Sequence, residues 1–413
     1  MNIAIANRRY FESTGPERYL FGIKKMLEDD GNFVFPFSVK RKGNYECMGS
    51  EYFVNPPSGE DVLFYKDYTV TKRQALKIFC NAIYSFEAKG KMHRLLEEKK
   101  INLLYLLSIV NDISPSIIDA AYSMKIPVIM RISDYYLLCP EYRFLRDGKI
   151  CQECFQGLYH ALRYKCVQGD FAPTFTRVIS MYIHKWLNIY DKVSYFITPS
   201  DCMKQNMIRG GFPEGKVIFI PSFFDVSDKE PCYENKGYIL FFGRISKDKG
   251  VLILLEAINK GKIDIPVFIA GESPDSTLNE LKDYVLKNNL KNIHFVGFKK
   301  GKDLEETIKG ALFTIVPSIW LDNSPMSVME SMAYGKPVIG TDIGGISEQI
   351  TEECGMKFSL GNSEELAFKI KHMLSNPLKI TEMGMKARER VEKVYAPEIH
   401  YESLTKVFAQ ALQ

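Results

Sequence analysis

The sequence predicts an α/β protein in which two doubly wound parallel-sheet domains face each other across a cleft. Short apolar runs alternate with amphipathic stretches of helical period, a pattern typical of βαβ units. The alternation occurs twice, and the polar, turn-rich stretch SFFDVSDKEPCYENK separates the two series. Ligands bind such folds at the carboxyl ends of the strands. The sequence therefore predicts a functional site between the two halves.

Residues 1–221 form the first expected domain, 222–236 the linker, 237–395 the second domain, and 396–413 a final helix. The expected strands of the first domain are Asn2–Ala6, Asn32–Pro36, Leu103–Val110, Pro127–Arg131, Tyr195–Thr198 and Val217–Ile220. The second domain restarts with GYILFFGR, followed by the expected strands Pro266–Ala270, Ile293–Val296, Leu312–Val316 and Pro337–Gly340.

The composition and charge of the chain argue against a nucleic-acid-binding protein and against a membrane-spanning one. Over 413 residues the formal charge is only +4, which argues against a nucleic-acid binder with a strongly basic domain. Apolar runs such as LLYLLSIV are far shorter than the roughly 18 residues of a membrane-spanning helix. The start of the chain lacks the pattern of a secretory signal, and the nine cysteines are an odd number, so we expect a reducing, cytoplasmic compartment.

The stretch GRISKDKG follows the first strand of the second domain. Gly243 permits a tight turn, Arg244 offers a planar fork for phosphate oxygens, and Lys249 adds a point charge before a helix. These residue types suit a diphosphate. Taken alone, one Arg and one Lys near a turn are more often residues of a solvated surface.

The stretch from Trp320 to Gly340 carries two carboxylates eight positions apart, Asp322 and Glu330. If a helix begins near Pro325, Asp322 lies in the preceding loop and Glu330 about a turn and a half inside the helix. Ionised carboxylates accept hydrogen bonds from vicinal hydroxyls, so they could hold a sugar and a ribose. Backbone N–H groups of residues 324–327 would face phosphates. The alternative is that Asp322 caps the helix and Glu330 is a surface acid.

Taken together, these motifs resemble the retaining glycosyltransferases of family four, which have the GT-B fold. The acid, the Glu eight positions later, SMAYGKPVIG and TDIGGISE match the family pattern in order, as do GRISKDKG, VFIAGE and HFVGF. The resemblance implies that Arg244 and Lys249 neutralise the donor diphosphate, Glu330 holds the ribose and Asp322 holds the transferred sugar.

The same resemblance implies further donor contacts. The turn at Gly297 and Phe298 would line the base pocket through backbone groups, and Gly15 in STGPERY would approach the donor phosphate and sugar. The other donor-binding positions are Gly243, Gly271, Asn323, Ser324, Pro325, Met326 and Ser327.

Two positions depart from the family pattern. The first acid is usually Glu, whereas this chain has the shorter Asp322. Many members carry His before the aspartate of the strand-end loop, whereas Ser133 precedes Asp134 here. Asp134 is a catalytic candidate within the cleft, and these departures would alter donor choice or reduce activity.

The resulting hypothesis is that the protein transfers a sugar from a UDP- or GDP-sugar to a glycan or lipid-linked acceptor. The transfer would retain the anomeric configuration and use no catalytic metal. Its role would be the assembly of a surface polysaccharide such as O-antigen, capsule or exopolysaccharide. Arg244 and Lys249 would stabilise the charge of the leaving nucleotide. Two alternatives are a GT-B sugar-nucleotide epimerase and an inactive nucleotide-sugar-binding protein.

Two further segments allow both a functional and a structural interpretation. Cys139, Cys151, Cys154 and Cys166 could supply a structural zinc site, or serve as small buried apolar residues. In residues 66–100, basic residues outnumber acidic ones nine to four and are interleaved with apolar residues. This segment could contact an anionic membrane peripherally, or form helices that pack on the first sheet.

Overall fold

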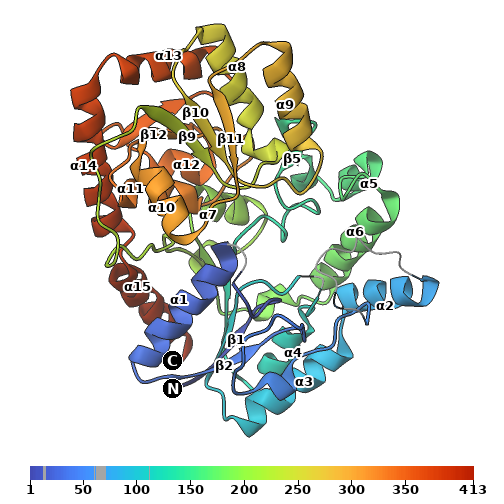
Figure 1. Ribbon diagram of the computed structural model, residues 1–413. Helices are drawn as coiled ribbons and strands as arrows, with labels where there is room; N and C mark the ends of the chain where they lie inside the picture. Colours follow the sequence, from blue (N-terminus) through green and yellow to red (C-terminus); the bar gives the residue numbers. More distant parts are fainter. Residues whose placement is uncertain (13–14, 60, 62–70, 111) are drawn as a thin grey trace.

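The computed structural model describes residues 1–12, 15–59, 61, 71–110 and 112–413. Two six-stranded parallel sheets, each covered by helices, make up the bulk of the molecule (Figure 1). The strands of both sheets are almost continuously apolar, as LLYL in β3 illustrates, because helices cover both faces of a parallel sheet. This arrangement confirms the predicted α/β class with two doubly wound sheets.

The N-terminal sheet has the strand order β2-β1-β3-β4-β7-β8. Its strands are β1 (Asn2–Ala6), β2 (Phe33–Phe37), β3 (Leu103–Leu106), β4 (Val128–Arg131), β7 (Tyr195–Thr198) and β8 (Val217–Phe219). Its helices are α1 (Gly15–Asp29), α2 (Lys72–Ile83), α3 (Phe86–Glu98), α4 (Ser116–Ser123), α5 (Tyr159–Tyr164), α6 (Phe171–Trp186) and α7 (Asp201–Arg209).

The C-terminal sheet has the order β11-β10-β9-β12-β13-β14. Its strands are β9 (Tyr238–Phe242), β10 (Val267–Ala270), β11 (Ile293–Gly297), β12 (Ala311–Val316), β13 (Val338–Thr341) and β14 (Gly355–Phe358). Its helices are α8 (Val251–Gly261), α9 (Thr277–Lys287), α10 (Gly301–Lys309), α11 (Met326–Ala333), α12 (Gly344–Gln349), α13 (Ser363–Leu374) and α14 (Pro377–Val394).

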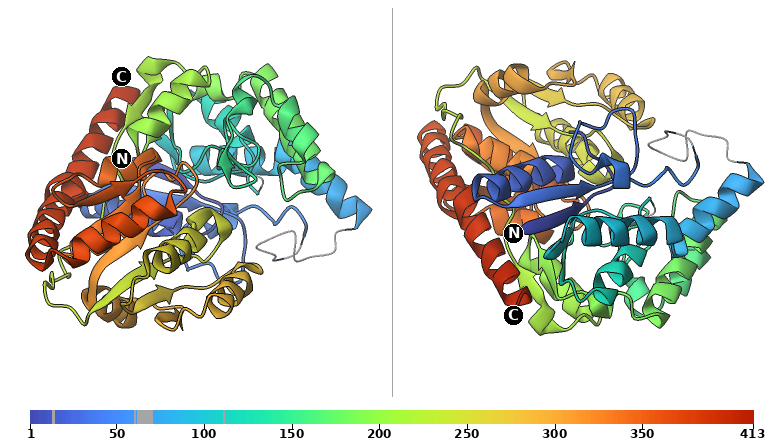
Figure 2. Two further views of the ribbon diagram at one scale, coloured as in Figure 1. Left: turned by 90° about the horizontal axis from the view of Figure 1, so that it is seen from above. Right: turned by 90° about the horizontal axis from the view of Figure 1, so that it is seen from below.

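The last helix, α15 (Pro397–Ala411), returns to the N-terminal sheet, as both figures of the whole chain show (Figures 1 and 2). Its buried residues Leu404, Val407 and Phe408 join a core cluster with Ile3 and Ile5 of β1. The rings of Phe408 and Tyr105 lie 5.4 Å apart in an edge arrangement. The chain therefore crosses between the two halves twice.

The structure differs from the sequence prediction most clearly in four strands. Strand β3 ends at Leu106, four residues before the predicted end, because Ser108 leaves the sheet and donates its N–H to the side chain of Asn7. Strand β14 and the small hairpin of β5 (Leu145–Arg146) and β6 (Lys149–Ile150) were not predicted. These three strands contain two to four residues, too few to show a period.

Candidate active site

Two glycine turns follow adjacent strands of the C-terminal sheet. Gly243 follows β9 and Gly271 follows β10, with φ angles of 139° and 152°. A Cβ atom on Gly271 would lie 1.9 Å from the carbonyl oxygen of Gly243, so the two turns can meet only if residue 271 has no side chain. The close contact brings the start of GRISKDKG to the carboxyl edge of the sheet, where ligands bind in this fold.

Lys249 and Asp322 form the centre of the candidate site. They lie 73 positions apart in the sequence, yet Lys249 Nζ is 2.5 Å from Asp322 Oδ2. The carboxylate is only 6% exposed, and the hydroxyl of Ser318 also donates to it at 3.4 Å. The ammonium group also lies 5.6 Å from the ring centroid of Trp320, a favourable cation–π placement. An ammonium has three hydrogens, so Lys249 can hold Asp322 and an anion together.

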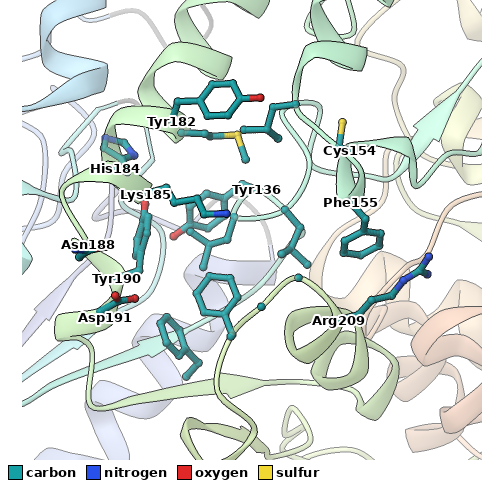
Figure 3. Close-up of a pocket in the computed structure, with 18 of the residues that line it drawn as sticks. Tyr136, Cys154, Phe155, Tyr182, His184, Lys185, Asn188, Tyr190, Asp191 and Arg209 are labelled. Carbon is teal, nitrogen blue, oxygen red and sulfur yellow. The ribbon is translucent and has the colours of Figure 1, made fainter.

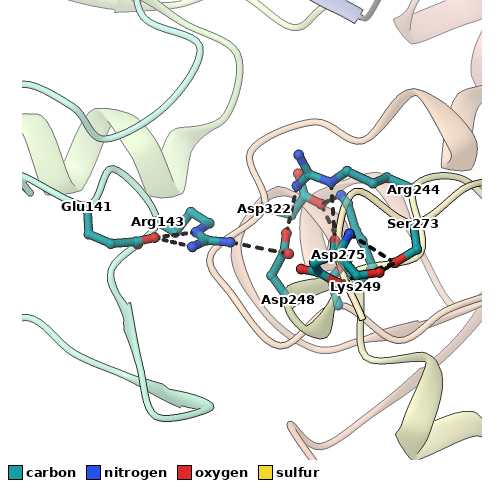
Figure 4. A network of polar contacts seen from close by, with 10 residues as sticks. Glu141, Arg143, Arg244, Asp248, Lys249, Ser273, Asp275 and Asp322 are labelled. Carbon is teal, nitrogen blue, oxygen red and sulfur yellow. Dashed lines mark hydrogen bonds and ion pairs between the residues drawn. The ribbon is translucent and has the colours of Figure 1, made fainter. Parts of the chain in front are cut away.

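Arg244 lies beside this pair and is anchored by a neighbouring acid. Its Nη2 donates to Asp248 at 2.9 Å and its Nε to Ser246 at 3.1 Å. Its side chain remains half exposed, so the guanidinium can still bind a ligand. Figure 4 shows Arg244, Lys249, Asp248 and Asp322 together.

Glu330 lies on α11, inside the helix as predicted, with a partner from the other half of the molecule. Arg18 of α1 donates to its Oε1 at 2.6 Å. The first residue of α1, Gly15, faces the same helix, because a Cβ there would lie 3.5 Å from Met326 Cγ. The N-terminal turn of α1 and the start of α11 therefore meet where the sequence places donor-binding residues. Ser13 and Thr14 of the same loop lie outside the described residues.

The loop before α11 contains two buried polar atoms without protein partners. Asn323 donates to the carbonyl oxygen of Ser133 at 2.8 Å, whereas its Oδ1 accepts nothing from the described residues. Trp320 Nε1 likewise has no partner among them. Ser324 accepts a hydrogen bond from Gln349, and Pro325 is the N-cap of α11, which contains Ser327. Unpaired buried polar atoms are costly unless a ligand satisfies them.

The turn predicted to line the base pocket follows β11. Gly297 ends β11 with a φ of 73°, and its carbonyl oxygen accepts the N–H of Gly271 at 2.9 Å. Phe298 is 58% exposed. The turn is therefore tied to the Gly271 turn, and its backbone groups are the part that remains a candidate for the base pocket.

Asp134 lies after β4 and does not contact the Lys249 group. Its Oδ1 accepts the N–H of Tyr136 at 3.0 Å, and burial raises the pKa of its carboxyl group. Its neighbour Ser133 is held from two sides: Arg131 donates to its hydroxyl at 3.0 Å, and Asn323 reaches its carbonyl oxygen. Ser133 thus contacts the C-terminal half through its backbone.

Four residues of the site region were missed by the sequence prediction: Arg18, Glu141, Arg143 and Asp248. Arg143 bridges the halves, with Nη1 3.3 Å from Asp248 Oδ1 and its other nitrogens donating to Glu141 (Figure 4). Arg18 and Asp248 stand inside quoted motifs, so the motifs themselves were a signal. Nothing in the sequence distinguishes Glu141 or Arg143.

The predicted zinc site stays a prediction, and its four cysteines lie near one another: a hydrogen bond with Cys139, burial and the charges of Cys139, Cys166 and Cys151 raise the pKa of Cys154. All four cysteines are free thiols. A hydrogen bond with Cys154 lowers the pKa of Cys139, so these two lie together. Across the described ranges, no three His, Cys, Asp or Glu side chains are placed to hold a metal ion.

The basic segment divides into two different helices. Helix α3 buries Ala88, Met92, Leu95 and Leu96 against the N-terminal core, as the packing alternative expects. Helix α2 buries only Ala82 and leaves Leu76 64% exposed beside Lys72, Arg73 and Lys77. Residues 66–70 lie outside the described residues. No helix of the described part of the chain is long and apolar enough to cross a membrane.

A separate cavity of about 450 Å³ lies in the N-terminal half, between α6 and the segment from α7 to β8. Tyr136, Phe155, Tyr182, His184 and Arg209 are among its lining residues (Figure 3). None of the predicted donor-binding residues lines it. The cavity is therefore distinct from the candidate active site.

The part of the chain that carries most of the candidate site matches a known protein family. Residues 223–390 match the family model described as Glycosyl transferases group 1. The fold is GT-B. The matched range contains the whole Lys249 and Asp322 group, whereas residues 1–222, including Arg18 and Arg143, lie outside it.

Individual relatives that match part of this chain are named as glycosyltransferases. An uncharacterized glycosyltransferase of Methanocaldococcus jannaschii is 30% identical over 40% of this chain and 47% of its own length. The D-rhamnosyltransferase WbpZ of Pseudomonas aeruginosa is 27% identical over 38% of this chain and 41% of its own length. The chain thus spans less than half the length of either relative.

Two solved structures share the fold over nearly the whole chain. Sucrose-phosphate synthase from Thermosynechococcus elongatus superimposes with a TM-score of 0.71 at 16% identity, covering 99% of this chain and 98% of that protein. HepE from Anabaena in complex with UDP-glucose has a TM-score of 0.68 at 15% identity, covering 99% and 100%. At these identities the likeness shows the GT-B fold alone.

Proposed function

We propose that this chain is a retaining glycosyltransferase of family four that moves a sugar from a UDP- or GDP-sugar to a glycan or lipid-linked acceptor. The observation that carries the proposal is the contact of Lys249 with the buried Asp322, beside Arg244 and at the carboxyl edge of the C-terminal sheet. A cationic pair next to a buried carboxylate suits a negatively charged diphosphate joined to a hydroxyl-rich sugar.

The proposed chemistry assigns a role to each group. Arg244 and Lys249 stabilise the charge that develops on the leaving diphosphate, which removes the need for a catalytic metal. Asp322 accepts hydrogen bonds from the transferred sugar and Glu330 from the ribose. Retention follows if the acceptor attacks from the face that the diphosphate leaves, with a diphosphate oxygen taking the acceptor's proton.

The biological role we propose is surface polysaccharide assembly at the cytoplasmic side of the membrane. WbpZ transfers D-rhamnose by its name, and HepE binds UDP-glucose. Both support a nucleotide-sugar donor, and Asp322 is the position at which we expect this chain to select its own sugar.

The test is to incubate the purified protein with a panel of nucleotide sugars and to measure release of nucleoside diphosphate, with and without saccharide acceptors. We expect Lys249→Ala and Glu330→Ala to abolish release. Lys247→Ala is the matched control, because Lys247 lies two positions from Lys249 but pairs with Glu280 on the surface. Binding without release by the unmodified protein would contradict the enzyme assignment. Release of a modified free sugar in the absence of acceptor would favour an epimerase instead.

We further propose that α2 holds the enzyme at anionic membranes, where a lipid-linked acceptor would be found. The exposed Leu76 and the cations Lys72, Arg73 and Lys77 support this, because basic and apolar groups together bind such surfaces. Changing the three cations to Glu should abolish flotation with phosphatidylserine vesicles. Equal flotation of the variant, or no flotation of the unmodified protein, would refute the contact.

A further inference from the structure

Arg143 extends from the N-terminal half to the diphosphate-binding group of the C-terminal half. It lies outside the matched family range, on the segment between β4 and the hairpin of β5 and β6. Its Nη1 is 3.3 Å from Asp248 Oδ1, and Nε donates to Glu141 Oε1 at 2.7 Å. Both acids that it touches are less than 10% exposed, so the guanidinium lies in an enclosed, charged region.

The backbone on both sides of Arg143 is held in an unfavourable conformation. Tyr142 and Phe144 have φ angles of 66° and 52°, in the left-handed region that residues with a Cβ atom rarely adopt. Such a conformation persists only when surrounding contacts enforce it, and it is concentrated at functional sites. Here the anchor is Phe144, which is fully buried and packs on Tyr135 and Phe155 with ring centroids 4.7 and 5.2 Å away.

Asp248 holds two guanidinium groups side by side. Its Oδ2 accepts from Arg244 at 2.9 Å, and its Oδ1 faces Arg143 at 3.3 Å. The side chain is 2% exposed; burial alone would raise the pKa of this carboxyl, but Arg244, Lys249 and Arg143 lower it on balance. The Asp248 carboxylate therefore holds one arginine from each half at the same point.

The hydrogen atoms of the two arginines are not all used. Nη1 of Arg244 has no partner within the described part of the chain, and Nη1 of Arg143 carries two hydrogens of which Asp248 can accept one. Both groups can therefore donate to an anion while they remain anchored. Guanidinium groups favour phosphate oxygens because of their planar donor geometry.

We propose that Arg143 is a third cation of the donor diphosphate site, supplied by the N-terminal half to the pair Arg244 and Lys249. The inference rests on the proposed nucleotide-sugar site and adds a residue that the C-terminal half does not contain. Because Arg143 and Asp248 belong to opposite halves, the full set of cations exists only when the halves are in contact. Binding of the diphosphate is thereby linked to the relative position of the two halves.

The test is to measure binding of nucleoside diphosphate and monophosphate to the full chain by titration calorimetry, using UDP with UMP and GDP with GMP. We expect Arg143→Ala to weaken diphosphate binding about 10- to 100-fold, the range for one lost charge-assisted contact, and monophosphate binding by less than about threefold. Arg143→Lys should restore part of the loss, since a point charge replaces the planar fork.

Arg146→Ala is the matched control, because it removes a cation from the same segment, where Arg146 pairs with Glu153 at 2.9 Å. Thermal unfolding of each variant monitors the fold. Equal diphosphate affinity of Arg143→Ala and the unmodified protein, or an equal loss for Arg146→Ala, would overturn the role of Arg143. A parallel loss for monophosphate would show that Arg143 acts only by joining the halves. If the unmodified protein binds no nucleotide, the proposed function fails instead.

Discussion

The two sides of the candidate site differ in how they hold their charged groups. On the C-terminal side, Lys249, Asp322 and Glu330 each follow a parallel strand within a short turn or the first turns of a helix. On the N-terminal side, Arg143 stands on an irregular segment whose neighbours have left-handed backbone angles. Regular elements therefore carry sites with a recognisable spacing, whereas an irregular segment places its residues through tertiary packing alone.

The largest effect is expected for the buried carboxylate of the C-terminal side. Asp322→Ala removes the partner of Lys249 and the proposed sugar ligand, so kcat/KM should fall about 100- to 1,000-fold, as for other preorganised groups in active sites. Nucleoside diphosphate release is the measurement. Glu141→Gln is the comparison variant on the N-terminal side. A larger loss of kcat/KM in Glu141→Gln than in Asp322→Ala would contradict the greater importance that we assign to the C-terminal side.

A stability change is expected at the meeting point of the two glycine turns. Gly271→Ala should lower the free energy of unfolding by about 2 to 4 kcal/mol, because the new Cβ overlaps the carbonyl oxygen of Gly243 at a strained φ. Urea denaturation measures this. The control is Gly90→Ala, since Gly90 lies in α3 with nothing near its Cβ position and should gain up to about 1 kcal/mol. Similar changes for both variants would contradict the packing argument.

The N-terminal side should be the more acid-sensitive. Burial lowers the pKa of His184 to about 4 and that of His400, on the returning α15, to about 3. An unfolded histidine titrates near about pH 6.5. The unfolded state therefore binds protons first, so these groups cost no stability above pH 6.5 and reduce it as the pH falls toward 4.

At pH 5 we expect each histidine to lower the free energy of unfolding by about 2 kcal/mol. Urea denaturation at pH 7 and pH 5 measures the loss, and His184→Gln should reduce the difference between the two pH values. An unchanged difference in that variant would show that His184 is not the group responsible.

The smallest effect is expected at Ser133, although it departs from the family pattern. Its contact with Asn323 uses the backbone carbonyl, and its hydroxyl only accepts from Arg131. Ser133→Ala should therefore change kcat/KM with the preferred donor by less than about threefold, because the only hydrogen bond of the hydroxyl within the described part of the chain joins it to Arg131 and not to the proposed donor site. Asn323→Ala should cost more, since it removes the contact between the halves. The opposite order would place donor selection at the Ser133 hydroxyl.

The fold could be predicted to the level of individual strands because its signal is local. Buried parallel strands are continuous apolar runs, and β1 and β7 begin and end at the predicted residues. Strand β14, with the sequence GMKF, shows no such run, and it forms a strand because it pairs with β13. Its identity as a strand depends on a partner distant in the sequence.

The sequence predicted individual residues of the candidate site, but not the contacts between them. The residue types of Lys249 and Asp322 indicated a phosphate and a sugar, but their direct pairing required the folded chain. Arg143 carries no sequence signal, because an arginine in a loop is common and its contact with Asp248 depends on how the two halves meet. The donor-binding roles stay predictions until a nucleotide sugar is tested.

The double crossing between the halves has a mechanical consequence. At the two crossings the N–H of Phe224 donates to the carbonyl oxygen of Tyr395 at 2.8 Å, and the His400 ring bonds to the carbonyl oxygen of Pro221 at 2.6 Å. Two chain segments joined side by side behave as one hinge and resist twisting of one half against the other. Opening and closing about this axis is then the motion that the chain permits, and a protein cut before α15 would keep both sheets but lose the shared pivot.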